Sequence, residues 1–411
     1  MHTTDKGKAL IIWLSGARLQ DIRALPAVEE VLKCGANLAL EASPMIDAHN
    51  QYYQATSGRS PATFGFFDSL VVKNYAVVEE SSGRGTTPKL LPDLLRTGGW
   101  MVQYEEKPLS ALNATIRSWA QSATDPRSCL IVRCVVHANE ISAGLTSLLP
   151  MAVRSAQEAV GESGLLALLS ETQSASVKRF VNVNNFLAEM GVIERDEQSG
   201  TVNWFNSLAY FAGHGQLWVN LQGREPQGAA HPQEDYEEIR DTLVKALPTK
   251  LRDSGSGAPV IERVYRKEEL YQGDYLFCAP DLVVEFTPGY APSPKSTLLH
   301  FDEEVFTTPV SGTTALAGVH RSQATGFLLA AAPSLATNVS LSEVAPLTAV
   351  VPTLLHALGI EYVDMESQAI STLFSPAYLE LHPIRSSVQS QELSEEDEEL
   401  IINRLRDLGY V

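Results

Sequence analysis

Short runs of Val, Ile and Leu alternate along the chain with segments whose apolar residues recur every three or four positions. This alternation is typical of an α/β fold with a mostly parallel central sheet and helices on both faces. The predicted strands are residues 8–14, 71–77, 100–104, 130–136, 165–169, 216–220, 281–286 and 326–331. The predicted helices are residues 27–33, 89–96, 234–251 and 347–358. Proline at the first turn and glycine beyond the last turn mark the ends of the first two helices.

The domain organisation follows from length and composition. A chain of 411 residues can form one large α/β domain or two smaller ones. We expect a single domain over residues 1–388, with a possible surface loop near residues 253–257. Residues 389–411 are expected to form an acidic segment followed by a C-terminal helix.

Composition and charge exclude several classes of protein. Hydrophobic residues make up 44% and charged residues 19%, as in soluble globular proteins, and no apolar run approaches the roughly 20 residues of a membrane span. A formal net charge of -18, without a basic patch, opposes binding to nucleic acid or anionic membranes. No export signal opens the chain, and its four cysteines lie far apart, so we expect a cytoplasmic protein.

Polar residues follow three of the predicted strands. Because ligands of parallel sheets bind at the carboxyl ends of the strands, these residues should converge on one cleft. They are Ser15 and Gly16 after the first strand, His137, Asn139 and Glu140 after residues 130–136, and Ser170, Glu171 and Thr172 after residues 165–169.

Several sequence runs resemble the alkaline phosphatase superfamily, in its type I phosphodiesterase and nucleotide pyrophosphatase branch. The best match is Leu217-Trp-Val-Asn-Leu-Gln-Gly-Arg-Glu-Pro-Gln-Gly228, and Ala279-Pro-Asp-Leu-Val-Val284, Gly318-Val-His-Arg321 and Val351-Pro-Thr-Leu-Leu-His-Ala-Leu-Gly359 agree in order. The resemblance implies an alkaline-phosphatase-like fold. It also implies phosphoryl transfer at two divalent metal ions about 4 Å apart, which need some six Asp and His ligands and a Thr or Ser nucleophile.

Most of the residues that this chemistry needs are missing from the matching positions. Ser15 stands where the family has its first Asp, and Ala48 stands near the place of the nucleophile. The family's Asp and His four residues apart correspond to Ala138 and Ser142, and its Asp-His-Gly corresponds to Glu171-Thr172-Gln173. Only His320 matches a family ligand. The sequence therefore predicts that the two-metal site is lost, and we expect neither a metal nor a cofactor.

The remaining polar residues are candidates for a different chemistry. The candidate catalytic residues are His320, His137 and Glu140. The candidate substrate-binding residues are Arg321, Ser15, His49, Asn50, Asn139 and Glu171. Structural roles compete with each assignment. His320 and His137 could be packed rings, Glu140 could begin a helix, Arg321 could be a surface ion-pair partner, and Ser15 could belong to a turn.

Two further polar segments can be interpreted as parts of a site or as turns. Asp47, His49 and Asn50 lie in the loop that replaces the nucleophile region, as a remodelled pocket or as a solvated turn. Gly213-His214-Gly215 indicates a tight turn before the strand at 216–220 rather than a ligand.

Three functional hypotheses remain open. The first is a metal-independent enzyme that acts on a small anionic molecule, with the catalytic and binding residues named above. The second is a non-catalytic pseudoenzyme that binds a protein partner or a second copy of itself. The third is a residual phosphodiesterase with one metal at Glu171 and His320. None of the three involves nucleic acid or a membrane.

Overall fold

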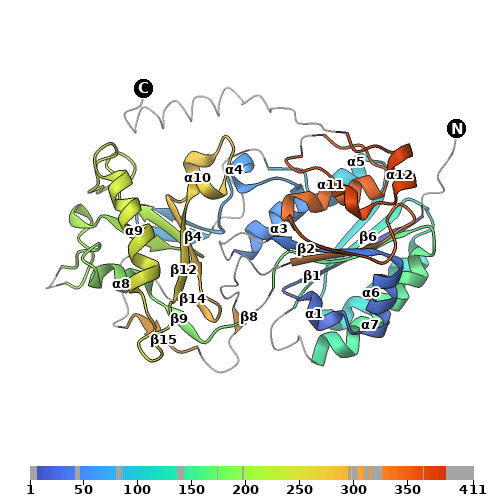
Figure 1. Cartoon of the computed structure of the whole chain (residues 1–411), viewed down its shortest axis with the longest axis horizontal. Helices are drawn as coiled ribbons and strands as arrows, with labels where there is room; N and C mark the ends of the chain where they lie inside the picture. Colours follow the sequence, from blue (N-terminus) through green and yellow to red (C-terminus); the bar gives the residue numbers. More distant parts are fainter. Residues whose placement is uncertain are drawn as a thin grey trace.

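The computed structural model describes residues 7–41, 47–79, 85, 87–136, 143–173, 175–196, 199–294, 298, 304–309, 314–315, 326–363 and 365–385. A seven-stranded sheet occupies one half of the molecule (Figure 1). Its strands, in spatial order, are β18 (Val339–Pro346), β2 (Ala36–Glu41), β17 (Gly326–Ala331), β7 (Leu165–Ser170), β1 (Ala9–Ser15), β6 (Ser128–Val135) and β5 (Met101–Glu106). All neighbours pair in parallel except at β17, which runs antiparallel to both β2 and β7.

Helices cover both faces of this sheet because its central strands are buried on both sides. Ile11 and Trp13 of β1 face one layer, and Leu10 and Ile12 face the other. The first layer contains α3 (Ala48–Ser57), α5 (Leu91–Thr97), α11 (Val350–Ala357) and α12 (Pro376–Leu381). The second layer contains α1 (Leu19–Ile22), α2 (Pro26–Cys34), α6 (Leu109–Ser122) and α7 (Ala143–Val160).

A second, antiparallel sheet lies in the other half of the molecule (Figure 1). Its strand order is β10 (Ala209–Ala212), β11 (Gln216–Val219), β13 (Leu282–Phe286) and β12 (Ile261–Arg266). The helices α8 (Val183–Glu189) and α9 (Tyr236–Lys250) share its apolar core. The smaller elements here are α4 (Pro61–Phe64), β8 (Ala175–Ser176), β9 (Arg179–Val181), α10 (Lys267–Leu270), β14 (Tyr290–Pro292), β15 (Phe306–Thr307) and β16 (Thr314–Ala315).

The predicted α/β class is confirmed, and so are the predicted strands of the central sheet. The strands predicted at residues 216–220 and 281–286 form as β11 and β13, but they pair antiparallel in the second sheet. The strand predicted at residues 71–77 is wrong. These residues form a hairpin of β3 (Leu70–Lys73) and β4 (Ala76–Glu79), with Asn74 and Tyr75 in its left-handed turn.

The left-handed turn is stabilised by the burial of Tyr75. Its ring stacks on Trp204 with the ring centroids 4.0 Å apart, and its hydroxyl donates a hydrogen bond to Asn220. This packing offsets the cost of a positive φ in a residue with a bulky side chain. The local pattern of apolar residues predicts one continuous strand, because it does not reveal that Tyr75 packs against the distant Trp204.

No helix in the described part of the chain is long and apolar enough to cross a membrane. Residues 254–257 form an exposed turn whose amides bond to Asp253. Residues 389–411 lie outside the described residues, so the acidic segment and C-terminal helix stay predictions.

Candidate functional site

The carboxyl ends of β1, β6 and β7 meet at one edge of the central sheet. The amide of Gly16 donates a hydrogen bond to Ser170 Oγ at 3.2 Å, which joins the ends of β1 and β7. Trp13 lies opposite Arg133 in the parallel register of β1 and β6, so both side chains project from the face that α3 covers. The indole of Trp13 donates to Glu171 Oε2 at 2.6 Å.

Arg133 lies at the centre of this strand-end group. Its Nε donates to Ser15 Oγ at 3.1 Å, its Nη1 donates to Glu106 at 3.1 Å, and its Nη2 lies 3.8 Å from Glu171 Oε1. The guanidinium also stacks on the ring of Tyr52. Burial alone would lower the pKa of Arg133, but the carboxylates, first Glu171, raise it. We call these residues, Ser15, Glu106, Arg133 and Glu171, the arginine group.

The arginine group does not fit the two metal ions that the family's chemistry needs. In the sequence resemblance, Ser15 and Glu171 stand at two of the family's metal-ligand positions, and Arg133 contacts both. The Ser15 hydroxyl already accepts a hydrogen bond from this cation, and Glu171 is fully buried beside it. A guanidinium at this distance repels a divalent cation and occupies its coordination space.

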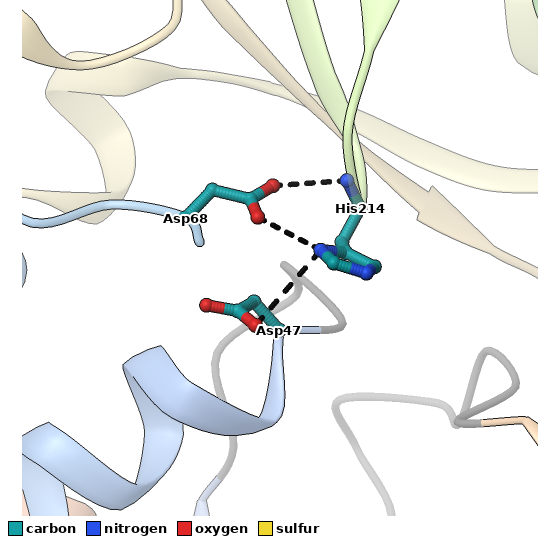
Figure 2. A group of neighbouring side chains, drawn as sticks. All are labelled: Asp47, Asp68 and His214. Atoms are coloured by element: carbon teal, nitrogen blue, oxygen red, sulfur yellow. Dashed lines mark hydrogen bonds and ion pairs between the residues drawn. The ribbon is translucent and has the colours of Figure 1, made fainter. Parts of the chain in front are cut away.

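A second group of charged side chains surrounds the amino-terminal end of α3. The turn between β10 and β11 carries His214 between Gly213 and Gly215, which both have positive φ. The backbone amide of His214 bonds to Asp68 Oδ2 at 2.9 Å, and its Nδ1 lies 2.8 Å from Asp68 Oδ1 (Figure 2). Gln216 also donates to Asp68, at 2.7 Å, so this buried carboxylate is held in one orientation.

Asp47 caps α3 and connects His214 to a second histidine. Its carboxylate accepts hydrogen bonds from the amides of His49 and Asn50 at the start of the helix. Ser69 donates to the same carboxylate through both its amide and its hydroxyl. The Nδ1 atoms of His49 and His214 lie 3.8 Å and 3.9 Å from one oxygen, Asp47 Oδ1. We call Asp47, His49, Asp68 and His214 the histidine group.

The carboxylates raise the pKa of both histidines. For His214, burial would lower the pKa, but the hydrogen bond to Asp68 and the charges of Asp68 and Asp47 outweigh it. For His49, the nearby Asp47 carboxylate is the main cause of the rise. Burial would raise the pKa of Asp47, yet its hydrogen bonds and the charges of both histidines lower it. Each histidine therefore keeps its proton at a higher pH than a free imidazole does.

Asp47, Asp68 and His214 could also hold a single metal ion, because one ligand atom of each lies within 4.8 Å of the others. Every carboxylate oxygen of this trio already accepts hydrogen bonds from protein groups. The donor set favours an Asp–His pair, because a metal would have to displace the Asp68–His214 hydrogen bond.

Four of the sequence-predicted site residues lie in or beside these groups. Ser15 and Glu171 belong to the arginine group, and His49 belongs to the histidine group. Glu171 is fully buried and Asn50 is nearly so. The Asn50 amide donates to the carbonyls of Phe66 and Phe67, so Asn50 supports the loop after α4 rather than facing a ligand. The candidates His137, Asn139, Glu140, His320 and Arg321 lie outside the described residues.

Sequence reasoning missed Asp68, Arg133 and the role of His214. The tight turn at Gly213-His214-Gly215 is confirmed. Its histidine does not simply fill the turn, because it reaches two carboxylates far away in the sequence. The one local indication in the sequence is a histidine between two glycines. Because Gly213 has no Cβ, the turn can approach Asp68 closely.

Three surface cavities formed by described residues lie away from this chemistry. Three cavities of about 400, 450 and 430 Å³ border α5, α11 and α12, and none of the three is lined by the arginine or histidine group. The chain segments next to the two groups, residues 42–46 and 137–142, lie outside the described residues. The side-chain chemistry is therefore the better guide to the site.

The chain has the alkaline-phosphatase-like fold of the nucleotide pyrophosphatase and phosphodiesterase structures. Murine ectonucleotide pyrophosphatase/phosphodiesterase 5, solved as an inactive variant in complex with AMP, is similar with a TM-score of 0.57 and 11% identity. That likeness covers 90% of this chain and 100% of the murine chain. The human protein gives a TM-score of 0.52 and 13% identity, over 92% of this chain and 100% of its own. No family model and no curated protein sequence matches.

Proposed function

We propose that this protein is an enzyme that acts on a small anionic molecule by acid–base chemistry, without the two-metal site that the sequence resemblance implies. One observation carries the proposal. Asp68 holds His214 through Nδ1, and the ring is 35% exposed with its second nitrogen pointing away from both carboxylates (Figure 2). A buried carboxylate that fixes one nitrogen of an imidazole and leaves the other open is the arrangement of a general acid or base.

The loss of two-metal phosphoryl transfer is supported by Arg133. Its guanidinium supplies one fixed positive charge between Ser15 and Glu171, the positions that would bind the metals in the family. This charge balances Glu171, which would otherwise be an unpaired buried carboxylate. The scaffold can thus remain stable without metal ions.

The proposed roles follow from these contacts. His214 donates a proton to the substrate, and its raised pKa lets the ring keep that proton to a higher pH than a free imidazole does. Asp68 fixes the tautomer and orientation of that ring. His137, Glu140 and His320 are proposed as further acid–base groups, and Arg321 and Asn139 as substrate contacts, on the sequence alone. The AMP bound to the murine relative supports a small anionic molecule as the substrate class.

The test is a turnover assay with the full chain after dialysis against a chelator. A panel of carboxylated and phosphorylated small molecules is incubated with the protein, and consumption is followed by mass spectrometry. We expect turnover to survive chelation and to fall about 10²- to 10⁴-fold in His214→Gln. His382→Gln, which changes a histidine beside α12, serves as the matched control and should leave turnover unchanged.

Two results would contradict the proposal. One is a wild-type chain that consumes no member of the panel, or whose turnover is the same in His214→Gln. The other is turnover that appears only with added zinc or manganese, which would favour a metal at Asp47, Asp68 and His214.

A further inference from the structure

Two histidines from distant parts of the chain share one carboxylate oxygen. His49 lies in the first turn of α3, and His214 lies in the turn between β10 and β11. The Nδ1 atoms of both rings are within 4 Å of Asp47 Oδ1. This common contact brings the two imidazoles together at the amino-terminal end of the helix.

The outer nitrogens of these rings are available to a ligand. The Nδ1 and Nε2 atoms lie on opposite sides of an imidazole, so Nε2 points away when Nδ1 faces a carboxylate. The side chains of His49 and His214 are 66% and 35% exposed. Among the described residues, no hydrogen bond reaches Nε2 of either ring.

The charged residues next to the two histidines are engaged with other protein groups, so the histidine rings are the donors that a ligand can reach. Asp47 and Asp68 face inward and accept hydrogen bonds from amides, Ser69 and Gln216. Arg133 and Glu106 also act on His49, but they neutralise each other through a direct contact. A ligand approaching the end of α3 therefore meets the outer Nε2 atoms of two histidine rings, in front of carboxylates that already accept hydrogen bonds.

We infer that His49 and His214 form an oxyanion-binding pair that grips a carboxylate or phosphate group of the substrate. Two charged N–H donors on separate rings can each bond to one oxygen of such a group. The inference rests on the proposed function, since it specifies how the same site holds the anionic part of the substrate. It also assigns His214 a binding role before proton donation.

The test measures binding of inorganic phosphate and of acetate to the full chain, by calorimetry and by NMR of the histidine rings. We expect wild-type protein to bind at pH 6 and to lose affinity as the pH rises through the raised histidine pKa values. His49→Gln and His214→Gln should each weaken binding by about tenfold or more, while His382→Gln should not. A stronger response to phosphate than to acetate, or the reverse, identifies which oxyanion the pair prefers.

Unchanged affinity in both His49→Gln and His214→Gln would overturn the inference, and so would affinity that increases with pH. Circular dichroism and thermal unfolding of the variants establish that they are folded. This outcome is separate from the failure of the proposed function, which would appear as unchanged turnover in His214→Gln. With a true substrate, His49→Gln should raise KM more than it lowers kcat.

Discussion

The arginine group and the histidine group both place a basic side chain between two carboxylates beside α3, but they differ in how far that side chain is exposed. Arg133 is only 13% exposed, and its donors contact Ser15, Glu106 and Glu171. His214 is 35% exposed, and only one of its ring nitrogens is held by Asp68. A charged side chain that is buried among its partners stabilises the fold, whereas a ring with one nitrogen held and the other exposed can take part in chemistry.

We therefore expect substitutions in the two groups to have different effects, one on stability and the other on protonation. Changes in the arginine group should lower the free energy of unfolding, because they leave a buried charge without its partner. Changes at the two histidine rings should mainly alter protonation, because the His49 and His214 side chains are 66% and 35% exposed. Four predictions test this division, beginning with the largest expected effect.

Glu171→Ala should destabilise the protein by about 3–5 kcal/mol, because it removes the buried partner of Arg133. It also leaves the Trp13 indole without its acceptor. Urea unfolding followed by circular dichroism measures the loss. The matched control is Glu106→Ala, which removes the other carboxylate of the same arginine. Because Glu106 is 60% exposed, its loss should cost less than about 1 kcal/mol. Equal losses in the two variants would contradict the division.

Asp68→Asn should lower the pKa of His214, because the hydrogen bond and the charge of Asp68 are the main causes that raise it. A histidine whose pKa is raised in the folded state stabilises the protein fully below its ordinary value of about 6.5. That contribution is lost as the pH rises through the folded-state pKa. NMR titration of the His214 ring measures the shift, and unfolding at pH 6 and pH 9 measures the stability. A titration curve that does not move would show that Asp68 does not control this ring.

The buried strands of the central sheet were predictable because each is a continuous apolar run between turn residues. The hairpin of β3 and β4 was not, because its turn depends on Tyr75 stacking against Trp204, a residue far along the chain. β2 was also missed. Its polar Asn37 and Glu41 interrupt the kind of apolar run that marks β1, β7 and β17.

The candidate site was only partly predictable for a related reason. Topology alone predicts that Ser15 and Glu171 come to one edge of the sheet. By contrast, the Asp68–His214 pair spans 146 positions, and neither residue belongs to a recognisable motif. Arg133 was missed because an arginine inside an apolar strand has no sequence signature that reveals its carboxylate partners.

Gly213→Ala tests how closely the turn must approach Asp68. A Cβ at this position would lie 2.6 Å from Asp68 Oδ2 and from Gln216 Nε2, and φ is already +58°. We expect a loss of about 2 kcal/mol, from the left-handed backbone and the displaced carboxylate together. Gly161→Ala is the control, since φ there is +66° but no atom lies within 4 Å of the added Cβ. It should lose only about 1 kcal/mol. Only Gly213→Ala should change the NMR titration of His214, and a similar change in both would contradict the close contact.

Ser15→Ala should have the smallest effect, a loss of about 1 kcal/mol, because it removes one hydrogen bond from Arg133 Nε. Glu171, Glu106 and the Tyr52 ring still hold the guanidinium in place. Urea unfolding gives the loss, and zinc binding by calorimetry should be the same before and after the change. A larger loss, or a gain of zinc affinity, would mean that Ser15 and not Glu171 positions Arg133. The cation between the strand ends would then depend on its hydroxyl contact rather than on its charge partner.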